Sequence, residues 1–213
     1  GPPLRVRVER ARALFGTWYE FFPRSAEGKT DSGSTFRQCL GRIDDAKAMG
    51  FDVIYFPPIH PIGETKRKGR NNSLLCEPGE PGVPYAIGNH RQGVNGGGHK
   101  DVAPELGTLE DFRWLVGEVK KRGMEIALDF AINCSPDHPY VTAHPEWFFK
   151  RPDGSIKYAE NPPKKYEDVY PLNFHNPDWR TLWKELRDVV LFWCEQGVRI
   201  FRVDNPHTKP VAF

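Results

Sequence analysis

Apolar runs alternate with amphipathic helical patterns along this chain, and this alternation limits the folds open to it more than any other feature. Near-continuous apolar residues, bounded by proline or glycine, are typical of β-strands that are buried on both faces, as in a parallel sheet. The runs with this character are residues 17–22, 51–56, 125–131 and 198–204.

Helical patterns fill the spaces between these runs. Residues 35–50, 108–123 and 176–197 repeat apolar side chains at helical spacing, and each pattern ends at or beside a glycine. Thr108 and Asp111 form a predicted capping box at the start of the second helix. Asn176 is the predicted N-cap of the third, followed by a proline at its first position. Alternating strands and helices predict an α/β fold with a parallel sheet and right-handed crossovers.

The connections are unequal in length. Residues 57–107 and 134–175 form very long loops after two of the strands, whereas each helix returns to the next strand in one or two residues. Long loops beyond the carboxyl ends of parallel strands are where such folds place their binding and catalytic groups. The four predicted strands fit either half of an eight-stranded barrel or a small open sheet, and the pattern alone does not choose between them.

Composition excludes several classes of protein. The 30 Lys and Arg residues nearly balance 28 Asp and Glu residues, so no basic surface for nucleic acid is expected. No apolar run approaches the roughly 18 residues of a membrane span. The 4 cysteines form no CxxC pair, which disfavours a disulfide framework or a zinc site and favours reduced thiols in a cytoplasmic protein.

Two basic clusters lie in the long loops. Residues 66–72 combine Lys and Arg with Gly and Asn, and residues 161–166 follow the third strand with two adjacent lysines. Either cluster alone fits an exposed, solvated turn. Lysines with backbone N–H groups also suit phosphate oxygens, and two such clusters at one edge of a sheet make a phosphate-bearing ligand an equal alternative to solvated turns.

Carboxylates close the third and fourth strands. Asp129 and Asp204 lie at neighbouring strand ends, within about 5–10 Å of each other given the spacing of strands. Arg202 precedes Asp204 by two residues and therefore points to the same face, where it would favour the ionised carboxylate that a nucleophile requires. A purely structural ion pair is the alternative. Loop histidines with no zinc spacing are expected to bind a polar ligand rather than a metal: His60, His99, His138 and His207.

Longer strings resemble a known group of enzymes. Residues 201–204 resemble the nucleophile motif of the α-amylase superfamily, and residues 129–134 resemble its strand-three motif, with Cys134 where most amylases have histidine. Nearly the whole chain is similar to the family of bacterial α-1,4-glucan:maltose-1-phosphate maltosyltransferases. The strings that carry this similarity are residues 56–63, 68–72, 134–139, 161–166 and 202–210.

The resemblance implies a (β/α)8 barrel of which only the first about four strands are present. Residues 15–213 would form this partial catalytic barrel, and residues 1–14 would be a linker or the tail of a preceding domain. The implied reaction moves a maltosyl unit from α-maltose 1-phosphate to the non-reducing end of an α-1,4-glucan with retention, in glycogen or α-glucan synthesis. The implied parent enzyme is a cytoplasmic homodimer without metal or cofactor.

The resemblance also assigns residues to roles. Asp204 matches the family's nucleophile, and Arg202 matches the arginine beside it. The residues that match the donor site are Lys68, Asn133, Asp168 and Asn205. Those that match positions near the phosphate are Lys164, Tyr166 and Asn161.

The family's acid/base glutamate follows strand five, and its transition-state-stabilising aspartate follows strand seven. The resemblance here ends just past strand four, so the isolated chain is expected to be inactive, because a retaining transfer needs an acid as well as a nucleophile. Alternatives are another hydrolase or isomerase of the α-amylase superfamily, for which the basic loops have no explanation, and a non-catalytic glucan-binding fragment indifferent to phosphate.

Overall fold

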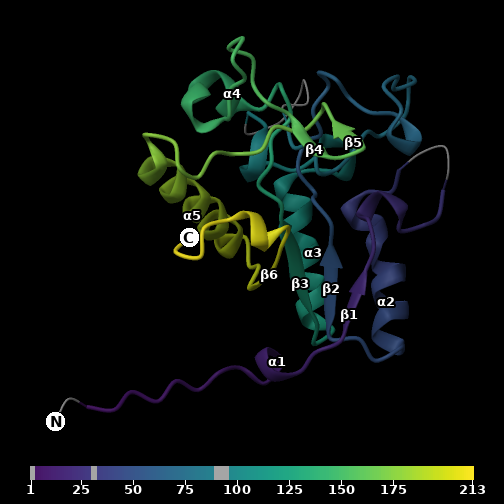
Figure 1. Cartoon of the computed structure of the whole chain (residues 1–213). Coiled ribbons are helices and arrows are strands. Elements are labelled where there is room, and N and C mark those ends of the chain that lie inside the picture. Colours follow the sequence, from purple (N-terminus) through teal and green to yellow (C-terminus); the bar gives the residue numbers. More distant parts are fainter. Residues whose placement is uncertain (1–2, 30–32, 89–95) are drawn as a thin grey trace.

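One parallel sheet organises the molecule. The computed structural model describes residues 3–29, 33–88 and 96–213. Its strands lie in the order β1-β2-β3-β6, all parallel (Figure 1). Their bounds are β1 Trp18–Glu20, β2 Val53–Phe56, β3 Glu125–Phe130 and β6 Ile200–Val203. The predicted α/β class is confirmed, and the strands of the described residues form a partial sheet that does not close into a barrel.

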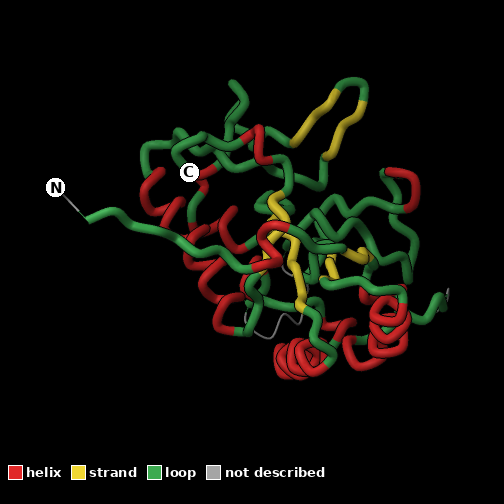
Figure 2. Tube along the Cα trace, turned by 90° about the horizontal axis from the view of Figure 1, so that it is seen from below, coloured by secondary structure: helices red, strands yellow, loops and turns green. Residues whose placement is uncertain are grey.

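The helices that connect these strands lie along one side of the sheet (Figure 2). They are α2 Leu40–Ala48, α3 Leu109–Lys121 and α5 Trp179–Glu195, with a turn of 3-10 helix, Phe36–Cys39, leading into α2. Side chains at alternate strand positions, such as Ile54 and Leu128, pack against them in a core that includes Phe112 and Trp193.

The opposite face of the sheet carries a second, smaller apolar group. Val53, Tyr55 and Ala127 are buried there, with Ile200 packed against them. Burial on both faces explains why the strands lack the alternating pattern of a half-exposed sheet. At the carboxyl end of this face the apolar side chains give way to Asp129 and the side chain of Arg202.

The long loops after β2 and β3 fold over the carboxyl ends of the strands (Figure 1). They contain α4 Pro139–Ala143 and an antiparallel hairpin of β4 Ala159–Asn161 and β5 Lys164–Tyr166. A separate core under these loops joins Trp147 and Leu172 to Leu182 and Leu186 of α5. The remaining short 3-10 helices are Pro23–Ser25, Arg70–Asn72, Gly98–Lys100, Pro104–Leu106, Pro145–Trp147 and Pro206–Thr208.

The N-terminal segment extends away from the sheet before the short helix α1, Ala11–Leu14 (Figure 1). Arg10 and Arg12 form ion pairs with Glu125 at the start of β3. Residues 1–2 of the predicted linker lie outside the described part. No helix of the described residues is long and apolar enough to cross a membrane.

The helix starts test two predictions from the sequence. The capping box of α3 is confirmed, since the Thr108 hydroxyl accepts from the Asp111 N–H at 3.1 Å and the Asp111 carboxylate accepts in return from the Thr108 N–H at 3.0 Å. The predicted N-cap of α5, Asn176, was wrong, because the N-cap of this helix is Asp178. The Asn176 side chain instead accepts from the Asp178 N–H at 2.7 Å, forming a turn just before the helix.

Candidate active site

Asp204 and Asp129 share one guanidinium at the carboxyl end of the sheet. Arg202 Nη1 donates to Asp204 Oδ1 at 2.6 Å and to Asp129 Oδ2 at 3.1 Å. The Asp129 side chain is fully buried, whereas that of Asp204 keeps 16% of its surface exposed. The predicted proximity of the two strand-end carboxylates is confirmed, and Asp204 is the member of the pair that a ligand could reach.

Asp129 is enclosed by phenol groups. Tyr55 and Tyr85 both donate to its Oδ2, the latter at 3.0 Å. Burial raises the pKa of Asp129, while the hydrogen bond from Tyr55 and the charge of Arg202 oppose that rise. Burial and the nearby carboxylate raise the pKa of Tyr85 to about 12, so this phenol remains a donor at neutral pH.

Asn205 holds the second oxygen of Asp204. Its amide Nδ2 donates to Asp204 Oδ2 at 3.0 Å, so each oxygen of the carboxylate has one donor. Asn205 has a positive φ of 46°, in the left-handed region that asparagine tolerates better than most residues. The end of β6 and the turn after it therefore bring Asp204, Arg202 and Asn205 together, of which the sequence predicted the placing of Arg202 beside Asp204.

Lys68 and Asp168 form a second polar group. The Lys68 side chain is only 2% exposed, and its ammonium donates to Glu167 Oε2 at 2.5 Å. Asp168 is buried beside them; burial raises its pKa, and the charge of Lys68 opposes this. The hydrogen bond from Lys68 lowers the pKa of Glu167. An ammonium has three donors, so the bond to Glu167 leaves Lys68 able to donate to a ligand as well.

The other phosphate-site candidates lie on the hairpin. Asn161 of β4 and Lys164 of β5 are opposite each other next to the turn, both exposed, and Tyr166 is half-buried at the far end of β5. The carbonyl of Lys165 accepts from Asn72 Nδ2 at 3.4 Å, which links this hairpin to the first basic loop. The two basic clusters are thus neighbours, although no hydrogen bond or ion pair among the described residues joins Lys164 to Lys68.

Asn133 is separate from both groups. It lines a cavity of about 310 Å³ between the loop after β3 and the turn after β6. The walls of this cavity include Phe149 and Phe174, and His207 and Lys209 contribute from the turn that follows Asp204.

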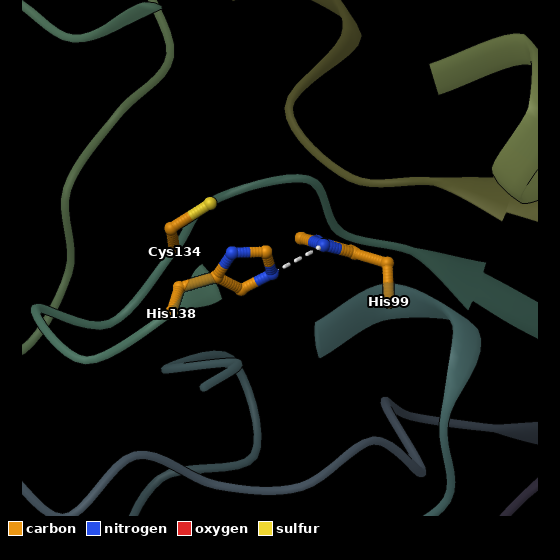
Figure 3. Close-up of side chains that lie close together, drawn as sticks. All are labelled: His99, Cys134 and His138. Atoms are coloured by element: carbon orange, nitrogen blue, oxygen red, sulfur yellow. Dashed lines mark hydrogen bonds between the residues drawn. The ribbon is translucent and has the colours of Figure 1, made fainter. Parts of the chain in front are cut away.

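A buried cluster of His99, Cys134 and His138 lies just past the carboxyl end of β3 (Figure 3). Their potential metal-ligand atoms all fall within 4.8 Å of one another. Sequence spacing gave no sign of this group, because the loops after β2 and β3 bring its members together.

The hydrogen bonds of this cluster already use the lone pairs that a metal would need. His138 Nδ1 accepts from the Tyr140 N–H at 3.0 Å, so a neutral His138 carries its proton on Nε2 and donates to His99 Nδ1 at 3.0 Å. His99 then donates from Nε2 to the Ala131 carbonyl at 3.0 Å. Burial lowers the pKa of His138 to about 3 and that of His99 well below its usual value, which keeps both rings neutral.

His60 belongs to the same buried region. Its Nδ1 lies 3.0 Å from the Asp101 carbonyl, to which it must donate. Three of the four loop histidines that the sequence suggested as ligand-binding groups thus make their bonds inside the protein, and His207 alone of the four is exposed.

Sequence reasoning missed three groups of the site. Tyr55 and Tyr85 were not chosen as partners of Asp129, and Glu167 was not chosen as the partner of Lys68. Tyr55 could have been predicted from the sequence, because its hydroxyl is the polar group of an otherwise apolar strand next to the strand of Asp129. Glu167 and Tyr85 lie in long loops, where spacing along the chain says little about position.

The arrangement suits attack on an electrophilic carbon. The Asp204 carboxylate has its orientation fixed by two donors and keeps part of its side chain exposed, and a carboxylate oxygen held in this way can act as a nucleophile. Buried charged groups at Lys68 and Asp168 provide directional hydrogen bonds of the kind that recognise hydroxyl or phosphate oxygens.

Comparisons with known proteins agree with this geometry. The chain is 55% identical over 211 residues to the α-1,4-glucan:maltose-1-phosphate maltosyltransferase of Methylacidiphilum infernorum, an alignment that covers 99% of this chain and 31% of that protein. It is 59% identical to the enzyme of the same name from Pseudomonas aeruginosa, over 98% of this chain and 31% of that protein. The chain thus spans about a third of the length of these relatives.

Solved structures show the same fold. An α-amylase from Lactobacillus plantarum superposes with a TM-score of 0.73 at 28% identity, over 92% of this chain and 40% of that one. A family profile described as the catalytic domain of α-amylase matches residues 22–209, which include every strand of the parallel sheet after β1 as well as the Asp204 turn. On the strength of this match, the partial barrel sheet and the carboxylate pair at its carboxyl end, the chain belongs to the α-amylase family.

Proposed function

We propose that this chain supplies the nucleophile and most of the donor site of a retaining maltosyltransferase. In this reaction an oxygen of Asp204 bonds to the anomeric carbon of α-maltose 1-phosphate while the bond from that carbon to the phosphate oxygen breaks. The 4-hydroxyl of an α-1,4-glucan then attacks the same carbon and releases Asp204, and the proton that it loses balances the one taken up by the departing phosphate. The products are inorganic phosphate and a glucan longer by one maltosyl unit.

The observation that carries this proposal is the fixed carboxylate of Asp204. Arg202 and Asn205 each hold one of its oxygens, and its side chain remains accessible at the carboxyl end of β6. Donors that hold a carboxylate in one orientation are what a displacement at a sugar carbon requires.

The second polar group supports an anionic sugar as the donor. Lys68 and Asp168 would hydrogen-bond sugar hydroxyls, since together they offer ammonium donors and carboxylate acceptors in a buried setting. Lys164, Tyr166 and Asn161, on the neighbouring hairpin, would bind the phosphate, and Asn133 would approach the donor from the loop after β3. We propose no metal or cofactor in this chemistry.

We further propose that the 213-residue chain by itself does not catalyse transfer. The phosphate leaving group needs a proton donor. The carboxyl to consider for this role is Asp129, which shares Arg202 with Asp204. Hydrogen bonds from Tyr55, Tyr85 and Arg202 already occupy its oxygens, so it is a poor acid for this step.

The wider setting follows from the same proposal. The complete enzyme would act in the cytoplasm in the synthesis of glycogen or a related α-glucan. It would work as a homodimer. Support for the cytoplasm comes from the four cysteines, all of which are free thiols.

Calorimetric titration of this chain with α-maltose 1-phosphate tests the proposal, with maltose and inorganic phosphate as controls. The phosphate ester should bind more tightly than either control. The substitution Lys164→Met should lower the affinity for the ester but not the affinity for maltose. Equal affinity for the ester and maltose would contradict a phosphate-specific donor site and favour a glucan-binding role. Release of phosphate from the donor by the isolated chain would contradict its proposed inactivity.

A further inference from the structure

Lys209 turns back onto the turn that carries Asp204. Its ammonium donates to the backbone carbonyls of Asp204 at 2.9 Å and Asn205 at 3.0 Å. A third bond goes to the hydroxyl of Thr208 at 3.0 Å. The three donors of the ammonium are thus all used within the turn, and all three acceptors are uncharged.

The backbone conformation makes these bonds matter. Two successive carbonyls point toward one ammonium because Asn205 lies in the left-handed region, with φ 46° and ψ 54°. A non-glycine residue is held in this region only where surrounding contacts favour it. Thr208 adds to these contacts, because its N–H and its hydroxyl donate to the Asn205 carbonyl at 3.1 and 2.8 Å.

This conformation in turn aims the functional side chains. The same φ and ψ of Asn205 direct its amide to Asp204 Oδ2. Lys209 touches neither carboxylate oxygen, so its contacts act on the position of Asp204 and Asn205 through the backbone.

The surroundings of Lys209 fit this task better than those of a surface lysine. It is half-buried and lines the cavity next to Asn133. Burial lowers the pKa of Lys209, and the charge of Asp204 opposes this. Lys184 on α5 offers the contrast, because it is exposed and has no hydrogen-bond partner in the described part of the chain.

We propose that Lys209 is a positioning residue: its ammonium clamps the carbonyls of Asp204 and Asn205 and so fixes the nucleophile and the amide that holds it. The structural part of this inference stands on the hydrogen bonds alone, while its consequence for the donor rests on the proposed function.

The test compares the 213-residue chain with Lys209→Met, which keeps the length of the side chain and removes its charge. Lys184→Met is the matched control. Lys209→Cys, alkylated with 2-bromoethylamine, restores an ammonium at nearly the original distance; the unsubstituted chain receives the same treatment, because it has 4 cysteines of its own. If Lys209→Met does not fold, Lys209→Gln takes its place.

The readouts are amide hydrogen exchange at Thr208, the carboxyl 13C resonance of Asp204 and the affinity for α-maltose 1-phosphate. Removal of the ammonium should speed amide exchange at Thr208 by about tenfold and weaken the binding of α-maltose 1-phosphate by about tenfold. It should also shift the carboxyl resonance of Asp204. The unfolding midpoint measured on the core should barely change, since Lys209 lies at the edge of the fold. Aminoethylation of the Cys variant should restore all three values.

Unchanged exchange and resonance in Lys209→Met would overturn the proposal, and so would failure of the alkylated variant to recover. If the unsubstituted chain does not bind the donor at all, the proposed function fails, but the exchange and resonance measurements still decide whether Lys209 positions the turn.

Discussion

Tyr55 of β2 and Tyr85 of the following loop donate hydrogen bonds to the same carboxylate oxygen of Asp129. Arg202 reaches that carboxylate from β6, so three elements meet on one buried side chain. Asp129 therefore anchors Arg202, and Arg202 in turn holds Asp204. The site depends on a chain of contacts that begins with these two phenols and ends at Asp204.

Replacement of Tyr55 by phenylalanine should destabilise the fold by about 1–2 kcal/mol, because it removes a donor from a buried carboxylate. Tyr85→Phe should cost less, since Tyr85 is only half-buried and Tyr55 would still serve the same oxygen. Urea unfolding of both variants and of the double variant measures these costs. A double variant no less stable than Tyr55→Phe would show that Tyr85 contributes nothing to Asp129.

Stability should fall as the pH drops below neutrality. Burial lowers the pKa of His60 to about 4 and that of His138 to about 3, whereas an unfolded histidine titrates near about 6.5. The unfolded state therefore binds more protons between these values. The stability that these neutral rings contribute is fully present above about pH 6.5 and is lost as the pH falls toward 4, by about 1.4 kcal/mol per pH unit for each histidine.

Urea unfolding between pH 7 and pH 4.5 measures this slope. The glutamine amide in His60→Gln can still donate to the Asp101 carbonyl. This variant should reduce the slope of stability against pH by the contribution of one histidine. His207→Gln is the control, because His207 is exposed. An identical slope in His60→Gln and the unsubstituted chain would contradict the assignment of His60 as a buried neutral ring.

The ion pair of Lys68 and Glu167 should show energetic coupling. Glu167→Gln removes the negative charge that is paired with the buried ammonium of Lys68. We expect the free energy of unfolding to fall by about 1–2 kcal/mol, a modest loss because Glu167 is partly exposed. The further substitution Lys68→Met should recover part of that loss. A double-mutant cycle in urea measures the coupling.

The exposed pair of Arg113 and Glu110 provides the comparison for that cycle. Glu110→Gln should change stability by no more than about 0.5 kcal/mol. A coupling for Lys68 and Glu167 no larger than that of the exposed pair would mean that burial of Lys68 does not strengthen the interaction.

Cobalt should not bind to the cluster of His99, Cys134 and His138. The hydrogen bonds to Tyr140 and Ala131 occupy ring nitrogens, and burial raises the pKa of Cys134 well above its usual value, which keeps the thiol protonated. Titration with Co²⁺ at neutral pH should therefore give no thiolate-to-metal absorption. A band that appears, and that Cys134→Ser abolishes, would establish a metal site and contradict this account.

The strands and helices could be predicted because their signals are local. The apolar run at residues 51–56 and the capping box at Thr108 both reflect short-range preferences that the tertiary structure keeps. The hairpin of β4 and β5 was missed because its strands of three residues each are too short and too polar to show a strand pattern. The cap of α5 was misplaced because Asn176 and Asp178 have similar preferences, and only the turn geometry distinguishes them.

The site could be predicted where it lies on strands and less well where it lies on loops. Asp129, Arg202 and Asp204 follow from strand register, which fixes neighbours once the sheet is known. Glu167, Tyr85 and Lys209 act through contacts set by long loops or by a left-handed turn. Residue spacing carries little information about such contacts.

The order β1-β2-β3-β6 is the same in space as along the chain. Each new strand of this sheet therefore has a ready edge on the strand of the same sheet that was synthesised before it. Domains begin to fold during synthesis from their N-terminal end, and this sheet can grow on the ribosome one strand and one helix at a time without waiting for a distant partner. Asp204 then arrives with β6, on an edge that the earlier strands have already built.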